Sequence, residues 1–315
     1  MVKNMMATFR RDSARPIRLA SLSLAAAIVL LVMPILMSWT PARAENDIEI
    51  RSNLVYREVG EQKLALDAYL PLAVGNGTGS ASAPLRAAVM VVHGGGWVGG
   101  DKADEHREYI SRILAQNGFV AISVNYRLAP DDVYPAAIDD LEAAIKWLRE
   151  PSQVASLGID PARIGVLGDS SGAQLAGLLG SLGQGPLTEG SRVAVAVSLA
   201  GPMSFLTDLA QAGGDKSVLG FLGCEQASPC PQRGEASPIT YVDSSDPPYL
   251  LVDGASDYVV RPEQAILMGA ALDKVGVANE ILIPPGDAHG SDLFHDQGVV
   301  NATITFLHKY LDAST

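Results

Sequence analysis

Ser170 stands between two glycines in the run Gly168-Asp-Ser-Ser-Gly172, which follows an apolar segment, 164–167, and precedes a run of small residues, 173–180. A serine on a sharp strand-to-helix turn presents an exposed hydroxyl, and the flanking glycines let neighbouring backbone pass closely. Such a hydroxyl attacks a carbonyl carbon only when a base removes its proton, so the chemistry also requires a histidine and an acid. The pattern predicts Ser170 as the nucleophile of an acyl transfer. A glycine-rich turn with a serine helix cap is the alternative.

The base is expected from the loop after the last predicted strand, and this part of the chain contains His289 and His295. His289 lies in a short turn, 285–290, that can point its imidazole at a serine. His295 falls inside or at the start of the last predicted helix, where we expect a surface position. His289 is therefore the predicted general base.

The acid is expected in the loop after the preceding strand, where Asp257 is found. Asp257 gives the chain order serine, aspartate, histidine that is known for nucleophiles on a strand-to-helix turn. Asp253 lies too close to the strand end, and Asp287, two residues before the histidine, is a weaker rival. Asp257 therefore completes the predicted triad.

A second glycine-rich motif, His93-Gly-Gly-Gly-Trp97, follows the apolar run 87–92. Its consecutive backbone N–H groups lack side chains and can converge on the oxyanion that develops when a serine attacks a carbonyl. The N–H of Ser171 is the expected companion donor. His93 precedes the serine in the chain, and we expect it to be structural.

The same glycines allow a rival interpretation, because Gly94, Gly96 and Gly99 match the G-x-G-x-x-G pattern of dinucleotide-binding domains. The residues that follow are polar rather than an apolar helix start. The next predicted strand ends in Tyr126-Arg127 instead of a ribose-binding acid. We therefore expect no nucleotide cofactor.

A metal site is another rival, because Asp287, His289, Asp292, His295 and Asp296 offer oxygen and nitrogen ligands at close spacing. The chain contains no HExxH motif. Acids near a helix start are also favoured by the helix dipole alone. We therefore expect the chemistry to use no metal ion.

Short β-rich runs alternate with longer helix-like runs, and several middle strands are continuously apolar, as when helices cover both faces of a parallel sheet. The predicted fold class is α/β, with a doubly wound, mostly parallel sheet of eight strands. The predicted strands are 48–58, 64–70, 87–93, 120–126, 164–168, 193–199, 249–252 and 279–283. The predicted helices are 105–115, 136–150, 171–182, 262–275 and 293–311. The Gly/Ser/Pro-rich stretch 201–245 interrupts the alternation and is predicted to be a small cap-like insertion.

The first 44 residues have the pattern of a signal peptide: a basic stretch to Arg18, an uncharged run, 19–39, and the small-x-small site Ala42-Arg-Ala44. Cleavage after Ala44 would leave a domain of residues 45–315 in the periplasm or outside the cell. A retained membrane anchor is the alternative, because the uncharged run approaches the ~20 residues that span a bilayer.

Export also affects how Cys224 and Cys230, the only two cysteines, are interpreted. In an oxidising compartment we expect them to form a disulfide within the insertion. Two independent thiols are the alternative.

Acidic residues dominate the charge beyond residue 44, where 34 acidic residues stand against 17 basic ones. A surface this negative repels a phosphate backbone, so we expect no nucleic-acid partner.

The motifs resemble those of the α/β-hydrolase superfamily, in the esterase and lipase branch related to hormone-sensitive lipase. They are most similar to a secreted, feruloyl-esterase-like group with a His-Gly-Gly-Gly-Trp motif. One departure is Asp253, where the family usually has histidine. The matching blocks cover nearly all of 45–315 and are HGGGW at 93–97, YRLAP at 126–130, YPAAIDD at 134–140, GDSSGA at 168–173, ASPIT at 236–240, GASD at 254–257 and AHG at 288–290.

The resemblance implies Gly95, Gly96 and Ser171 as oxyanion donors, and Trp97 as a substrate contact. It implies a secreted serine carboxylesterase that forms an acyl-enzyme, without metal or cofactor, on short-chain or hydroxycinnamoyl esters, including esters linked to polysaccharide. Peptide or amide hydrolysis by the same triad is the first alternative. A hydrolase-like binding protein without catalysis is the second.

Overall fold

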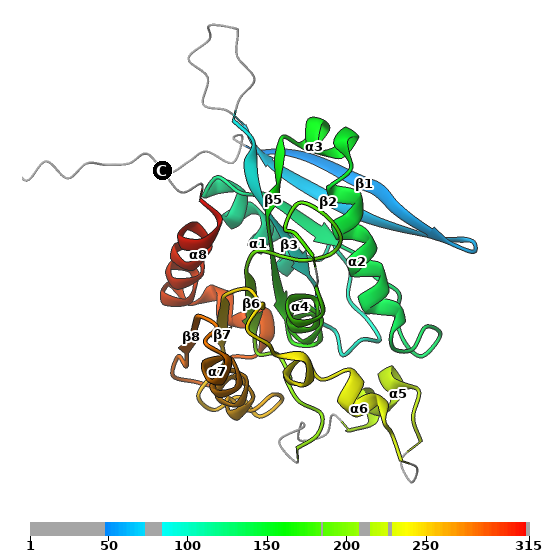
Figure 1. The fold of residues 1–315 in the computed structure, drawn as a ribbon, viewed down its shortest axis with the longest axis vertical. Helices are drawn as coiled ribbons and strands as arrows, with labels where there is room; N and C mark the ends of the chain where they lie inside the picture. The colour runs from blue at the N-terminus through cyan, green and yellow to red at the C-terminus, as the bar shows by residue number, and fades with distance from the viewer. Residues whose placement is uncertain (1–47, 73–83, 184, 208–214, 226–228, 313–315) are drawn as a thin grey trace, which may run out of the picture. The chain divides into compact units, whose positions relative to one another are not determined.

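The computed structural model describes residues 48–72, 84–183, 185–207, 215–225 and 229–312, and the predicted signal peptide lies outside these ranges. The strands are β1 (Ile48–Val59), β2 (Gln62–Pro71), β3 (Arg86–Val92), β4 (Val120–Val124), β5 (Ile159–Asp169), β6 (Ala196–Leu199), β7 (Tyr249–Val252) and β8 (Asn279–Leu282). Among the described residues they form one sheet in the order β1-β2-β4-β3-β5-β6-β7-β8 (Figure 1). β2 is antiparallel to both β1 and β4, and the other neighbours run parallel. The predicted α/β class with a mostly parallel sheet of eight strands is confirmed.

Helices cover both faces of this sheet, as the continuous apolar strands predict. The helices are α1 (Glu105–Gln116), α2 (Ala136–Leu148), α3 (Pro151–Leu157), α4 (Ser171–Leu182), α5 (Asp215–Leu222), α6 (Gln232–Glu235), α7 (Glu263–Val275) and α8 (Gln297–Leu311), with 3-10 helices η2 (Pro238–Tyr241) and η3 (Gly290–His295). Leu114 of α1 and Phe306 of α8 pack into one core. Leu141 of α2, Leu175 of α4 and Met268 of α7 pack into the other.

Strand β3 lies between these two cores, and its side chains alternate between them. Ala88, Met90 and Val92 belong to the core that contains α2, α4 and α7. Val89 and Val91 belong to the core that contains α1 and α8. Because successive side chains of a strand point to opposite faces, a strand covered on both faces has no polar side.

Two differences from the predicted elements have local causes. The predicted last helix, 293–311, is divided, because the Asp296 side chain accepts hydrogen bonds from the N–H groups of Gly298 and Val299 and caps α8. His295 therefore lies on η3, before this cap. Helix α3 was not predicted, although Pro151 at its start and Gly158, with φ +65°, at its end are ordinary boundary signals.

The stretch 201–245 carries α5, α6 and η2 in its described parts, in place of another strand and long helix. A disulfide joins Cys224 and Cys230, whose Cα atoms are 5.8 Å apart. No helix in the described part of the chain is both long and apolar enough to cross a membrane.

Parallel strands bring the predicted chemistry to one edge of the sheet, because their carboxyl ends lie together. The HGGGW motif follows β3, and Ser170 follows β5. Asp257 lies in the loop after β7, and His289 lies in the loop after β8. The fold therefore places four loops of interest at the same edge.

A buried carboxylate connects three elements next to this edge. Asp140 of α2 is 0% exposed and accepts hydrogen bonds from Arg57 of β1 at 2.7 Å and from Nε of Arg127 at 2.8 Å. It also accepts the backbone N–H of Arg127, which follows β4, at 3.0 Å. Arg127 belongs to the YRLAP block and Asp140 to the YPAAIDD block. The role of these two residues in the motifs is therefore structural.

We expect Asp140→Ala to lower the free energy of unfolding by about 3 kcal/mol, because it leaves the guanidinium groups of Arg57 and Arg127 without their shared partner. Asp139→Ala, at the exposed neighbouring position, is the control and should cost less than about 1 kcal/mol. Urea denaturation of both variants measures the difference. Equal losses in the two variants would show that the network contributes nothing specific.

Candidate active site

Ser170 has a strained backbone at the turn between β5 and α4. Its φ is 51° and its ψ is −120°, a conformation that non-glycine residues rarely adopt. The N–H of Ser170 donates to the carbonyl oxygen of Leu199 on the neighbouring strand, at 2.8 Å. The turn is therefore held by the sheet, and it positions the side chain at the start of α4.

The two flanking glycines are required by close backbone contacts. A Cβ on Gly168 would lie 2.1 Å from the carbonyl oxygen of Gly172, and a Cβ on Gly172 would lie 2.3 Å from that of Val92. Neither distance is possible for real atoms. The glycine spacing around the serine thus follows from how closely α4 approaches β5 and β3.

Three side chains from different loops form one hydrogen-bonded chain. Nε2 of His289 lies 2.9 Å from Oγ of Ser170, and Nδ1 of His289 lies 2.7 Å from Oδ2 of Asp257. Asp257 is 4% exposed, and its Oδ1 accepts the backbone N–H groups of Val259 and Val260 at 2.8 and 3.1 Å. With Nδ1–H donating to the carboxylate, Nε2 is left as the acceptor for the serine hydroxyl.

Two further glycines, in the GASD and AHG blocks of the sequence, bring the histidine loop to the serine. A Cβ on Gly254 would lie 2.4 Å from the carbonyl oxygen of Ala288, so the two loops touch there. Gly290 has φ +58°, and a Cβ on it would lie 3.2 Å from Oδ2 of Asp169. The glycines beside the predicted acid and base were the available signal.

The HGGGW loop contacts the serine at Gly94, where an added Cβ would lie 3.2 Å from Cβ of Ser170. The N–H of Gly94 is used internally, since it donates to Oδ1 of Asp169 at 3.0 Å. Gly95 and Gly96 have φ of +118° and +62°, and neither of their N–H groups donates to another described residue. Ser171 is the first residue of α4, so its N–H has no partner within the helix. These three N–H groups are the ones predicted as donors.

A buried ion pair between Arg107 and Asp169 holds the HGGGW loop in place. Arg107 of α1, 2% exposed, pairs with the carboxylate of Asp169, which also holds Gly94. Asp169 directly precedes the serine, so one carboxylate connects α1, the oxyanion loop and the nucleophile turn. The sequence did not reveal Arg107, because its partner lies 62 residues away in the chain.

His93 is part of the core. It is 1% exposed, and its ring stacks on Tyr126 with centroids 4.3 Å apart. Its Nδ1 hydrogen-bonds the carbonyl oxygen of Gly94 at 2.8 Å. Burial lowers the pKa of His93, so the ring is neutral and serves packing, as expected from the sequence.

Trp97 differs from the expectation of a substrate contact. Its side chain is 1% exposed and stacks on Phe221 of α5, with centroids 4.7 Å apart, while Phe205 meets it edge-on. Its Nε1 donates to Oε1 of Gln174 at 2.8 Å. Trp97 therefore connects the oxyanion loop to the insertion instead of facing a ligand.

The five residues considered as a metal cluster do not form one group in the structure. His289 belongs to the hydrogen-bonded chain with Ser170, and Asp296 caps α8. Asp292 and His295 approach His106 of α1, a residue that the sequence pattern did not include. Asp287 takes no part in that group.

The BD-FAE family model matches residues 67–272 of this chain. Esterase LipQ of Mycobacterium tuberculosis is 33% identical over 213 residues, which are 65% of this chain and 50% of LipQ. Arylacetamide deacetylase of Bos taurus is 42% identical over 93 residues, which are 29% of this chain and 23% of that protein. The chain thus spans half or less of the length of these curated relatives.

Among solved structures, an acetyl ester-xyloside bifunctional hydrolase from Caldicellulosiruptor lactoaceticus matches with a TM-score of 0.68 and 25% identity. The match covers 82% of this chain and 96% of that one. The family model covers well over half of the chain, and the topology agrees with that of the solved relative. The chain therefore belongs to the BD-FAE family of the α/β-hydrolase superfamily, in the esterase branch related to hormone-sensitive lipase.

Proposed function

We propose that this protein is a serine carboxylic-ester hydrolase in which Ser170, His289 and Asp257 form the catalytic triad. The observation that carries the proposal is the continuous hydrogen-bonded chain from the Ser170 hydroxyl through the imidazole to a buried carboxylate. Its position on a strained strand-to-helix turn, in contact at Gly94 with the loop that carries Gly95 and Gly96, supports an attack on a carbonyl carbon.

In the proposed first half-reaction, Oγ of Ser170 attacks the ester carbonyl and Nε2 of His289 takes the hydroxyl proton. The carbonyl oxygen becomes an oxyanion, which the N–H groups of Gly95, Gly96 and Ser171 stabilise. The N-terminal end of α4 adds a positive partial charge at this point. As the C–O bond to the alcohol breaks, His289 returns the proton to the alkoxide, and an acyl-enzyme remains.

In the second half-reaction, His289 removes a proton from water, and the resulting hydroxide attacks the acyl carbonyl. Collapse of the intermediate releases the carboxylic acid, and the proton returns to Ser170. Asp257 keeps the proton of the neutral imidazole on Nδ1 and stabilises the imidazolium that forms in each half-reaction. No step needs a metal ion or a cofactor.

The substrates that we propose are acetyl and other short-chain or hydroxycinnamoyl esters, including esters attached to polysaccharide. The similarity to an acetyl ester-xyloside hydrolase and to an esterase supports this class. We also propose that the protein acts after export, with cleavage following Ala44. The disulfide in the insertion is consistent with an oxidising compartment.

Amide hydrolysis is a second candidate reaction, favoured by the similarity to a protein named arylacetamide deacetylase. An amine leaves only when it is protonated, and Nε2 of His289 can supply that proton as it does for an alcohol. The same residues would therefore serve both reactions.

We expect Ser170→Ala and His289→Ala each to lower kcat/KM for p-nitrophenyl acetate by about 10⁴-fold or more, because each removes part of one cooperative unit. His308→Ala, at a half-buried histidine that contacts Asp312 and Phe119, is the control and should keep its activity. A fluorophosphonate probe should label the wild type and not Ser170→Ala. Undiminished labelling of Ser170→Ala would refute the nucleophile. A well-folded wild type inactive on ester and amide panels would favour the non-catalytic alternative.

Two acids near the triad have opposite environments. Asp257 accepts hydrogen bonds from two backbone N–H groups and from His289. Asp253 is 1% exposed, and its Oδ1 has no hydrogen-bond partner among the described residues. Burial, and then the charge of Asp257, raise the pKa of Asp253 well above its ordinary value. The surroundings of Asp253 therefore shift the pKa of this acid toward its neutral form.

We expect Asp257→Asn to lower kcat about 10⁴-fold, because an amide cannot hold the productive histidine tautomer. Asp253→Asn should stay within about threefold of the wild type, because an amide closely replaces a neutral carboxyl. Similar losses in both variants would contradict the distinction between the two acids.

Asp253→Asn should also change how stability depends on pH. In the wild type the folded state keeps a proton that the unfolded chain has already lost, so this carboxyl makes stability fall as pH rises above its ordinary pKa. The variant lacks that dependence. We therefore expect the melting temperature of the variant minus that of the wild type to increase from about pH 5 to about pH 8. A difference that stays constant over this range would contradict the raised pKa.

The insertion reaches the oxyanion loop through α5. Phe221 of α5 stacks on Trp97, and a Cβ on Gly96 would meet the Ser217 side chain at 4.0 Å. The disulfide partner Cys224 follows α5, and its N–H donates to the carbonyl oxygen of Leu219 at 2.9 Å. We propose that the disulfide fixes the end of α5 and thereby the shape of the substrate pocket.

The double variant Cys224→Ser/Cys230→Ser should change KM or acyl-chain preference more than it changes the melting temperature. Chain entropy predicts only a modest stability loss, below the ~3 kcal/mol of a 15-residue loop. Michaelis kinetics over p-nitrophenyl esters of increasing chain length provide the measurement. Unchanged kinetics would remove the pocket role, and two alkylatable thiols in the untreated mature protein would contradict the disulfide.

A further inference from the structure

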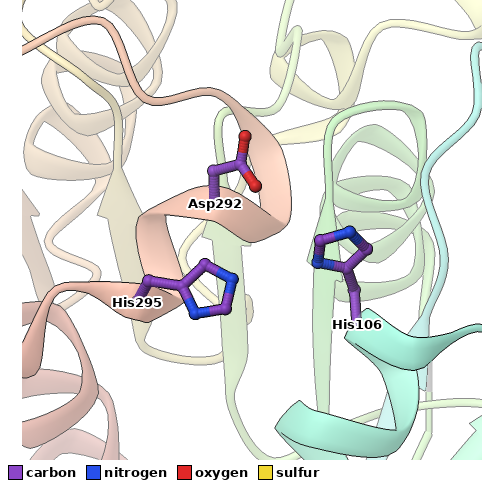
Figure 2. Close-up of side chains that lie close together, drawn as sticks. All are labelled: His106, Asp292 and His295. Carbon is purple, nitrogen blue, oxygen red and sulfur yellow. The ribbon is translucent and has the colours of Figure 1, made fainter.

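Two histidines and an aspartate lie together outside the triad. His106 comes from the first turn of α1, and Asp292 and His295 come from η3. One potential ligand atom from each residue lies within 4.8 Å of those from the other two. Figure 2 shows the imidazoles of His106 and His295 facing one another, with the Asp292 carboxylate beside them. Two separate elements thus present three metal-ligating side chains to one point.

The spacing is close to that of a bound metal site. Ligands that each lie about 2.0–2.2 Å from a tetrahedral Zn²⁺ ion are about 3.3–3.6 Å from one another. The observed limit of 4.8 Å is larger by about one to one and a half ångströms. Asp292 and His295 are exposed and His106 is half-buried, so small side-chain rotations can close the difference.

The three side chains are not engaged in other polar interactions. Within the part of the chain that the structure describes, no hydrogen bond or ion pair involves the side chain of His106, Asp292 or His295. His295 is oriented by a ring contact with Tyr109 of α1, at 5.0 Å between centroids. The ligand atoms therefore remain available, while the neighbouring ring restricts one of the imidazoles.

The donor set selects a class of ion. Imidazole nitrogen suits Zn²⁺, Ni²⁺ and Cu²⁺, whereas Ca²⁺ and Mg²⁺ require mainly oxygen ligands. The acids Asp104 and Glu105 at the start of α1 add negative charge, which offsets the positive end of the helix dipole. Three protein ligands leave the fourth tetrahedral position for water.

We propose that His106, Asp292 and His295 form a binding site for a divalent transition-metal ion of the Zn²⁺ type, which joins α1 to η3. η3 begins at Gly290, directly after His289, and α1 carries Arg107, the partner of Asp169. The ion therefore connects the element next to the catalytic base with the element that supports the nucleophile turn. Its role is structural, because the triad histidine is not among its ligands.

The test is a titration with ZnCl₂ by isothermal titration calorimetry. The protein carries no tag, is treated with EDTA to remove bound metal, and is then transferred to EDTA-free buffer. The wild type should bind one equivalent. Asp292→Ala and His295→Ala should each weaken binding by at least about tenfold, because each removes one of three protein ligands. Two controls accompany the titration. His308→Ala, at a half-buried histidine on α8, should bind zinc as the wild type does. CaCl₂ in place of ZnCl₂ should show no binding to the wild type.

His289→Ala separates this site from zinc bound at the triad. The proposal requires His289→Ala to bind zinc as tightly as the wild type, and saturating ZnCl₂ to raise the melting temperature of His289→Ala but not of His295→Ala. Loss of binding in His289→Ala with retention in His295→Ala would overturn the proposal, as would a wild type without saturable binding. His106→Ala tests the third ligand and should also weaken zinc binding. If His106→Ala does not fold, the Asp292→Ala and His295→Ala variants decide the outcome.

Discussion

The close approach of backbone to backbone at the carboxyl edge of the sheet is the constraint on which the site depends. Helix α4 begins so near β3 that no side chain fits at Gly172, and β5 turns so sharply that none fits at Gly168. Ser170 lies between them with a left-handed φ, so its side chain is the one group that the turn presents. The strain is supported by the sheet, because the turn donates a hydrogen bond to β6.

The same edge buries charge, and that charge fixes the loops relative to one another. Asp169 is nearly inaccessible, yet it satisfies both Arg107 and the N–H of Gly94. The N–H groups of Gly95 and Gly96, which follow in the loop, have no partner among the described residues. An isolated buried carboxylate would be costly, so the arginine and the loop conformation depend on one another.

Much of this arrangement could be predicted from the sequence, because strand periodicity and glycine spacing are local signals. The eight strands and the grouping of Ser170, Asp257 and His289 follow from them. Arg107 could not be found in this way, since its partner is distant in the chain and only the fold joins them. Trp97 was misjudged because a motif gives the position of an aromatic residue and not the packing partners that bury it. His106 was missed for the same reason, as its neighbours come from another element.

Asp253 and Asp257 show how environment, and not residue type, divides the roles of two acids four positions apart. Asp257 is buried, but two backbone N–H groups and an imidazole donate to it, so its charge is compensated. Asp253 is buried without such donors at Oδ1, and the charge of Asp257 further opposes its ionisation. A negative charge at Asp257 repels one at Asp253, which is why this neighbour adds to the effect of burial in raising the pKa of Asp253. Burial and the nearby charge of Asp257 thus both oppose a second carboxylate charge at position 253.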